Sequence, residues 1–166
     1  MKRLFTCLIL ILGLIVSAQA ALAQPASSSI EHWHTGGVGL STPLGFNAGA
    51  SYSVVVKGPL FVQLNASVSK DIYVTKHSVY AVGPALGLRH YTDVALTSLS
   101  VGPTYTRGTR GADLLAPYAG YESASMTVTG QVLFREINMG FELYTHFNNV
   151  RTVSGLRLIY RLGQFR

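Results

Sequence analysis

Strict alternation between apolar and small or polar residues constrains the fold of this chain more than any other feature. Every second residue of 46–54 is apolar, and Asn, Gly and Ser lie between them. After the turn at residues 57–59 the pattern restarts and continues over residues 60–68. Side chains alternate between the two faces of a β-strand, so this period of two predicts a hairpin. Pairing Val56 with Leu60 keeps both apolar sets on one face.

The two faces of the next hairpin differ in the same way. A two-residue turn at Thr92-Asp93 places Leu86 opposite Leu99 on a bulky, apolar face. The other face is small and polar, with Gly83 opposite Gly102. A soluble barrel or sandwich would expose more Lys and Glu, whereas a membrane barrel turns apolar residues to lipid and polar residues to its lumen. The pattern therefore predicts a transmembrane barrel with a narrow, filled interior.

Eight segments of this kind define the predicted fold class. It is all-β, an eight-stranded antiparallel up-and-down transmembrane β-barrel, because an even strand number and lengths near ten residues suit a tilted barrel. Eight strands enclose a space just wide enough for side chains, so we expect no diffusion pore. Prolines remove ladder hydrogen bonds, and we expect Pro84, Pro103 and Pro117 at bulges or strand ends. The expected strands are residues 35–42, 46–57, 60–70, 78–91, 94–106, 114–125, 131–147 and 150–163.

The N-terminus has the pattern of a cleavable signal peptide. Lys2 and Arg3 precede an uncharged apolar run at residues 8–16, and small residues with A-x-A spacing follow. The run is shorter than the roughly 20 residues of a spanning helix, so we expect cleavage after Ala23. The predicted location is the bacterial outer membrane, after Sec-type export. The chain then divides into a signal peptide at 1–23, a lead-in at 24–34 and one outer-membrane β-barrel domain at 35–166.

Charged residues on the inward face are expected to form ion pairs. If Asn148-Asn149 is the two-residue turn of the last hairpin, Glu136 opposes Arg161, and Glu142 lies diagonal to Arg157. An unpaired charge is costly both in lipid and in a packed interior. Paired carboxylates could serve acid–base catalysis, but their Arg partners favour a filled interior without catalysis. The predicted lumenal ion-pair network comprises Glu136, Arg161, Glu142, Arg157, Arg89 and Glu122.

The predicted outer loops are rich in positive charge. With the N-terminus in the periplasm, these loops would form a basic outer rim at Lys70, Lys76, Arg107, Arg110 and Arg151. One hypothesis is that the rim binds lipopolysaccharide phosphates through charge-assisted contacts; the alternative is a merely solvated rim. The charges lie at scattered loop tips and line no aromatic groove, so we expect no nucleic-acid binding. We also expect no cofactor and no metal, since His32-x-His34 alone is a weak metal motif.

The leader, the eight alternating segments and the C-terminal "GLRLIYRLGQF" together resemble the small outer-membrane β-barrels of the OmpA/OmpX type. The resemblance covers residues 36–165 and is architectural. It implies a monomeric barrel that is embedded in outer-membrane lipids and lipopolysaccharide and inserted by the barrel-assembly machinery. Such barrels often end in the aromatic residue that this machinery recognises. Here Phe165 is penultimate and Arg166 is last, which bears on the efficiency of that recognition.

A second, local resemblance is to the lipid A deacylases, which are eight-stranded outer-membrane barrels with a His-x-Ser-Asn run. His146 and Asn149 match the run, but Asn148 occupies the nucleophile position and has no hydroxyl, and no Glu follows Glu142. Alternation places His146 on the lumenal side, opposite Arg151. We therefore expect a non-catalytic protein with a membrane-structural or cell-surface interaction role. A lipid A-modifying acyl hydrolase and a soluble periplasmic ligand-binding barrel remain the alternatives.

Overall fold

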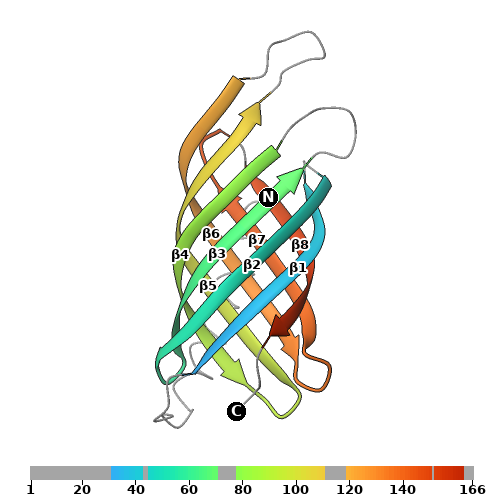
Figure 1. Cartoon of the computed structure of the whole chain (residues 1–166). Coiled ribbons are helices and arrows are strands. Elements are labelled where there is room, and N and C mark those ends of the chain that lie inside the picture. The colour runs from blue at the N-terminus through green and yellow to red at the C-terminus, as the bar shows by residue number, and fades with distance from the viewer. Residues whose placement is uncertain (1–30, 43–44, 71–77, 111–118, 151, 163–166) are drawn as a thin grey trace, which may run out of the picture.

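The eight strands form one closed antiparallel barrel (Figure 1). This computed structural model describes residues 31–42, 45–70, 78–110, 119–150 and 152–162. Each strand pairs with the next along the chain, and β8 pairs with β1, as the sequence predicts. Within these residues, no helix has the length and apolar character needed to cross a membrane. The strands are β1 (His32–Thr42), β2 (Gly45–Lys57), β3 (Leu60–Lys70), β4 (Ser78–Tyr91), β5 (Ala95–Arg110), β6 (Ala119–Phe134), β7 (Met139–Phe147) and β8 (Val153–Leu162).

The two ends of the barrel differ in the lengths of their connections. At the end where β1 begins and β8 finishes, the strands are joined by residues 58–59, 92–94 and 135–138. At the opposite end they are joined by residues 43–44, 71–77, 111–118 and 148–152. We call these the short-turn end and the long-loop end. The β5–β6 hairpin projects farthest at the long-loop end (Figure 1).

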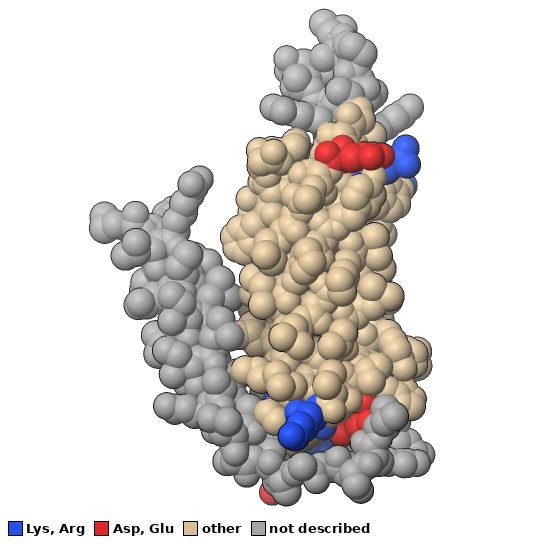
Figure 2. Space-filling view, turned by 90° about the vertical axis from the view of Figure 1, so that its left-hand side faces the viewer, with Lys and Arg blue, Asp and Glu red and all other residues tan. Residues whose placement is uncertain are grey.

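Polar residues predominate inside the barrel, and bulky apolar residues cover its outside. Among the described buried residues, twenty are polar or charged and eleven are apolar. On the face shown in Figure 2, described charged side chains lie only near the two ends, and the surface between them carries none. The inverted distribution expected from the alternation is therefore present. Outward-facing apolar side chains include Leu40, Leu64, Leu86, Val101, Phe141, Leu143, Leu156 and Leu158.

The β2–β3 register is the predicted one up to the pair Val55–Phe61, but a bulge between Val55 and Lys57 places Lys57, and not Val56, opposite Leu60. The β4–β5 register is displaced by two residues. Leu86 pairs with Val101 instead of Leu99, because the turn is longer than two residues: the backbone N–H of Thr92 donates to the carbonyl of Ala95 at 2.8 Å. A displacement of two keeps every side chain on its face, whereas a displacement of one would exchange the faces. The inside and outside of this hairpin were therefore predicted correctly despite the wrong partners.

Pro84 and Pro103 lie in the middle of β4 and β5, not at bulges or strand ends as expected. The register places them opposite each other, and the ladder is interrupted between the pairs Val82–Tyr105 and Leu86–Val101. Neither proline has an N–H to donate. Strands β4 and β5 lie close together here, and glycine is needed at Gly83, because a Cβ at this position would lie 2.2 Å from the carbonyl oxygen of Pro103. Both prolines thus share one gap in the ladder. Pro117 lies outside the described residues.

The boundaries of β6 and β7 correct the sequence prediction most. Residues 135–138 form a turn, although 131–147 was expected to be a continuous strand. Asn138 has a positive φ of 53°, which Asn tolerates better than most residues, and the backbone N–H of Arg135 donates to the Val94 carbonyl at 3.0 Å. Residues 126–130, which were expected to form a connection, instead belong to β6. Glu136 therefore lies exposed in a turn and not in a strand.

The final hairpin is also longer at its connection than predicted. The chain turns over residues 148–152, and the amide N–H of Val150 donates to the Asn148 side-chain oxygen at 2.7 Å. Glu142 consequently pairs directly with Arg157, not diagonally, and His146 pairs with Val153, not with Arg151. The predicted two-residue turn at Asn148-Asn149 is wrong. Because the connection is longer, the register is again displaced by two residues.

Candidate functional site

The described interior is filled from the short-turn end upward, beginning with an aromatic and aliphatic layer. Its side chains come from five different strands, and all are fully buried or nearly so: Trp33, Phe61, Leu96, Leu133 and Ile159. Trp33 and Phe61 are in contact, with ring centroids 5.2 Å apart. An apolar layer of this kind excludes water across the lumen, and it therefore closes the barrel at this height.

Beside this layer, Glu31 provides a carboxylate that the sequence analysis missed. Arg89 Nη1 lies 2.7 Å from Glu31 Oε2 and donates to the Tyr91 hydroxyl at 2.7 Å. That hydroxyl donates to Glu31 Oε1 at 2.5 Å. Glu31 was assigned to a lead-in at 24–34, but β1 begins at His32, and the Glu31 carbonyl accepts the amide N–H of Val55 at 2.8 Å. The alternation of β1 therefore starts earlier than predicted.

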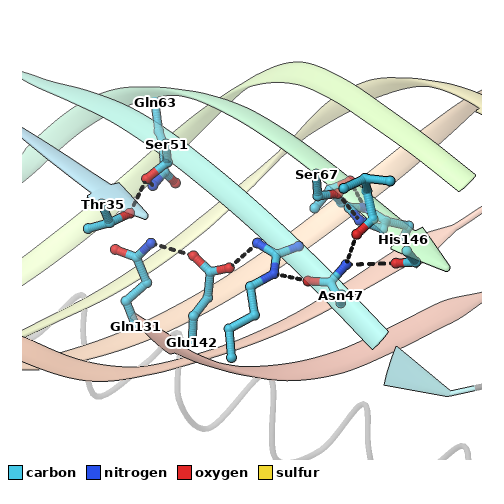
Figure 3. Close-up of polar contacts among 12 residues, drawn as sticks. Thr35, Asn47, Ser51, Gln63, Ser67, Gln131, Glu142 and His146 are labelled. Carbon is cyan, nitrogen blue, oxygen red and sulfur yellow. Dashed lines mark hydrogen bonds and ion pairs between the residues drawn. The ribbon is translucent and has the colours of Figure 1, made fainter. Parts of the chain in front are cut away.

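A second ion pair joins the neighbouring strands β7 and β8 on the lumenal face (Figure 3). Glu142 on β7 and Arg157 on β8 are both buried, and the Arg157 guanidinium contacts the Glu142 carboxylate and the Asn47 side-chain oxygen. Gln131 Nε2 donates to Glu142 Oε2 at 2.6 Å, and Asn47 Nδ2 donates to Ser69 Oγ at 2.7 Å. Five strands are thus tied together by charge-assisted and amide hydrogen bonds in one layer.

His146 lies nearer the long-loop end and faces inward, as predicted. Its Nδ1 is hydrogen-bonded to Thr127 Oγ1 at 2.7 Å, and its Nε2 to Ser67 Oγ at 3.2 Å across the lumen. A hydroxyl beside an imidazole is the first half of a nucleophile–base pair. The group that orients the imidazole here is a hydroxyl, however, and not the carboxylate of a catalytic triad. The contacts fit a packed polar interior at least as well as a reaction centre.

Two members of the predicted lumenal network lie elsewhere. Glu136 is exposed in the β6–β7 turn, so the predicted Glu136–Arg161 pair does not form. Arg161 is buried and lies over the Trp33 ring, 5.9 Å from its centroid. Glu122 points outward on β6, where it lies 3.7 Å from Arg107 with both side chains largely exposed. The prediction failed for Glu136 because the boundary between β6 and β7 was wrong. It failed for Glu122 because the alternation of β6 puts this residue on the same outward face as Ala124 and Met126.

The predicted basic rim is described only in part. Lys70 ends β3 and is exposed, and Arg107 lies on the outward face of β5. Arg107 was expected in a loop, but β5 extends to Arg110. The Arg110 side chain, Lys76 and Arg151 lie outside the described part of the chain.

His32 and His34 both point outward near the short-turn end. His34 stacks on Tyr52 with ring centroids 4.6 Å apart, and the two imidazole centroids are 6.3 Å apart. Within the described residues, no cluster of three or more His, Cys, Asp or Glu side chains could hold a metal ion. The His32 ring also lies near Tyr52, tilted and with centroids 6.2 Å apart, so both imidazoles belong to an aromatic surface patch.

Comparison with known proteins supports the fold. No protein-family model matches the sequence, and no curated protein is significantly similar to it. Among solved structures, the chain is similar to the crystal structure of Neisserial surface protein A (NspA), with a TM-score of 0.57 and 15% sequence identity. The similarity covers 84% of this chain and 99% of that chain. The chain thus belongs structurally with closed, eight-stranded antiparallel β-barrels such as NspA.

Proposed function

We propose that this protein is an exported barrel that spans the bacterial outer membrane and has a structural or cell-surface interaction role without catalysis. The observation that carries the proposal is the inverted surface, in which bulky apolar side chains point outward over a polar interior. Such a surface is costly in water, because soluble proteins rarely expose large contiguous apolar patches. It matches the lipid-facing band of an outer-membrane barrel. The name of NspA, a surface protein, agrees with this location.

The filled lumen supports the absence of a solute pathway. An apolar layer around Trp33 and an ion-paired layer around Glu142 lie one above the other in the barrel. Eight-stranded barrels have an interior that side chains can fill completely. The structural role therefore fits better than that of a porin.

Contact with lipopolysaccharide and insertion by the barrel-assembly machinery are further parts of the proposal. Lys70 and Arg107 provide positive charge at the long-loop end, where extracellular loops of outer-membrane barrels are found. The proposed signal peptide at 1–23 and the C-terminal Phe165 lie outside the described residues.

Membrane fractionation of a Gram-negative host that expresses the full chain tests this proposal. We expect the protein in the outer-membrane fraction, resistant to urea extraction, and with a different gel mobility in SDS before and after heating. Recovery in osmotic-shock fluid would instead support a soluble ligand-binding barrel. Mass spectrometry of the host's lipid A serves as the enzyme test: loss of an acyl chain that depends on His146 would refute the non-catalytic role.

A further inference from the structure

A groove interrupts the bulky outer surface across β2 to β5. It has a volume of 540 Å³, within the range of roughly 300–1,000 Å³ that is usual for small-molecule sites. Three outward-facing alanines, Ala48, Ala50 and Ala66, line it, whereas valines occupy neighbouring positions in the same rows at Val38, Val68 and Val82. The groove is hollow because three small side chains take the place of bulky ones on adjacent strands.

The strand register shows how the groove is bounded. Ala50 pairs with Ala66, which pairs with Val82, which pairs with Tyr105. One row nearer the long-loop end, Val68 pairs with Tyr80 and Tyr80 with Arg107. Tyr80 and Tyr105 are 53% and 48% exposed. Two aromatic side chains therefore stand along one edge of the groove, on the same outward face as its alanine floor.

Two cations lie at the long-loop end of the groove. Arg107 lines it directly, and Lys70 lies one row farther out on β3, opposite Ser78. Strand β4 separates them, and Lys70 lies two residues farther along the strands. Two strand spacings and this offset place their backbones roughly 12 Å apart. Both side chains are long enough to approach one anion above Tyr80.

The charges around these cations leave them available for a ligand. Among the described residues Lys70 forms no ion pair, and Arg107 has its 3.7 Å contact with Glu122. The Arg107 and Glu122 side chains are 72% and 59% exposed. An exposed pair of this length contributes little, whereas a phosphate can accept bidentate, charge-assisted hydrogen bonds from Arg.

We propose that this groove binds one acyl chain of a phosphorylated outer-leaflet glycolipid of the lipid A type, with its phosphate held by Lys70 and Arg107. The inference rests on the proposed membrane location and lipopolysaccharide contact, and it deepens them by naming the groove that holds the acyl chain. The apolar floor and the tyrosine edge suit an acyl chain, and the two cations complement the phosphate. The long-loop end corresponds to the outer leaflet of an outer-membrane barrel, where this class of lipid resides.

Lipid retention by the purified full chain tests the proposal. The protein is extracted in mild detergent and titrated with bis-phosphorylated lipid A, dephosphorylated lipid A or phosphatidylglycerol, and bound lipid is measured by native mass spectrometry. We expect K70Q/R107Q to bind bis-phosphorylated lipid A on the order of tenfold more weakly than the wild type, because the charge-assisted hydrogen bonds to the phosphate are lost. We expect A66L, which fills the groove, to weaken binding as well. A124L is the matched control, because Ala124 also faces outward but lies beyond Tyr105 and outside the groove.

Each outcome distinguishes the site from the membrane location. Retention lost in both K70Q/R107Q and A66L, but kept in A124L, supports the groove. If A66L retains lipid A like the wild type, the contact is a surface charge effect and the groove proposal is wrong. Equal binding of phosphorylated and dephosphorylated lipid A, or of phosphatidylglycerol, overturns the assigned ligand. If the wild type fractionates with the outer membrane yet retains no lipid A, this inference and the lipopolysaccharide contact fail, while the proposed membrane location stands. If the wild type is periplasmic, the membrane location fails as well.

Discussion

The buried ion pair between Glu142 and Arg157 provides a strong test of the filled interior. The two side chains are 3% and 7% exposed, and the Glu142 carboxylate accepts hydrogen bonds from both Arg157 and Gln131. The substitution E142Q keeps the shape of the side chain and removes its charge. It therefore leaves the Arg157 guanidinium buried beside a neutral amide, without creating a cavity.

The magnitude follows from the environment of Arg157. Removing one partner of a buried ion pair costs about 3–5 kcal/mol, because the remaining charge has no compensation. Arg157 retains its contact with Asn47 and lies 4.0 Å from the centroid of the Tyr144 ring, and a desolvated cation–π contact contributes up to about 2 kcal/mol. We therefore expect the lower part of the range, about 3 kcal/mol of lost unfolding free energy.

Urea unfolding of the protein refolded into phospholipid vesicles would measure this loss. Trp33, the only tryptophan in the chain, is fully buried and reports unfolding by its fluorescence. The midpoint should fall while the denaturant dependence stays constant. The double variant E142L/R157M replaces both charges by apolar groups, and it should lie within about 1 kcal/mol of the wild type, since such replacements are often neutral.

E122Q is the matched control for the buried pair. Glu122 and Arg107 are exposed and 3.7 Å apart, so their separation should cost about 0–1 kcal/mol. If E142Q and E122Q lower the unfolding free energy equally, by less than about 1 kcal/mol, then the interior is hydrated and the reasoning from a filled lumen is refuted.

Three further outcomes are expected. In vesicles, L143R should lower the unfolding free energy by about 2–4 kcal/mol, because it places a charge on the lipid-facing surface. V94R, equally exposed but in a turn, should lower it by about 0–1 kcal/mol. Equal urea midpoints for the two variants would contradict a lipid-facing belt. G140A should cost about 1–3 kcal/mol of overpacking, because its Cβ would lie 1.8 Å from the Val132 carbonyl oxygen, whereas nothing lies within 4 Å of a Cβ on Gly36; similar thermal unfolding of G140A and G36A would refute the close approach. In planar bilayers the wild type should show no stable conductance steps, and a persistent open state would contradict the filled lumen.

The sequence could predict the barrel and the direction of most side chains, but not all strand partners. Both displaced registers, at β4–β5 and β7–β8, differ from prediction by two residues. A period-two pattern is insensitive to such a displacement, because it leaves every residue on its face. Arg89, Glu142, Arg157 and Arg161 were therefore placed inside correctly. The predicted partner of Arg161, Glu136, was wrong, and no partner was predicted for Arg89.

Strand boundaries are the second source of error, and they explain the misplaced Glu136. Glu136 was placed inside only because residues 131–147 were taken as one strand, while the turn depends on Asn138 adopting a positive φ. Glu122 was placed inside without a register for this strand, and the observed alternation of β6 puts it on the outward face. The sequence does not mark the end of β6, because residues 126–134 have no feature that distinguishes a strand from a connection.

Glu31 could have been found by counting charge. With Glu136 and Glu122 outside, Glu142 alone cannot compensate the inward arginines, so another carboxylate must face the lumen near Arg89. Alternation continued backward from Thr35 through Trp33 reaches Glu31 on the same face. The physical requirement for a counter-ion is thus a stronger guide to the start of β1 than the apolar pattern, which is weak there.

The described interior holds three arginines and two carboxylates, and aromatic rings complete their environment. The Arg89 guanidinium lies 4.7 Å from the centroid of the Tyr91 ring, while Arg157 and Arg161 lie over Tyr144 and Trp33. A planar guanidinium can stack on a ring while donating hydrogen bonds at its edge, which an ammonium cannot do. Charge compensation and space filling are therefore achieved by the same side chains. This dual role explains how a narrow barrel can carry several buried cations and still be closed by packing.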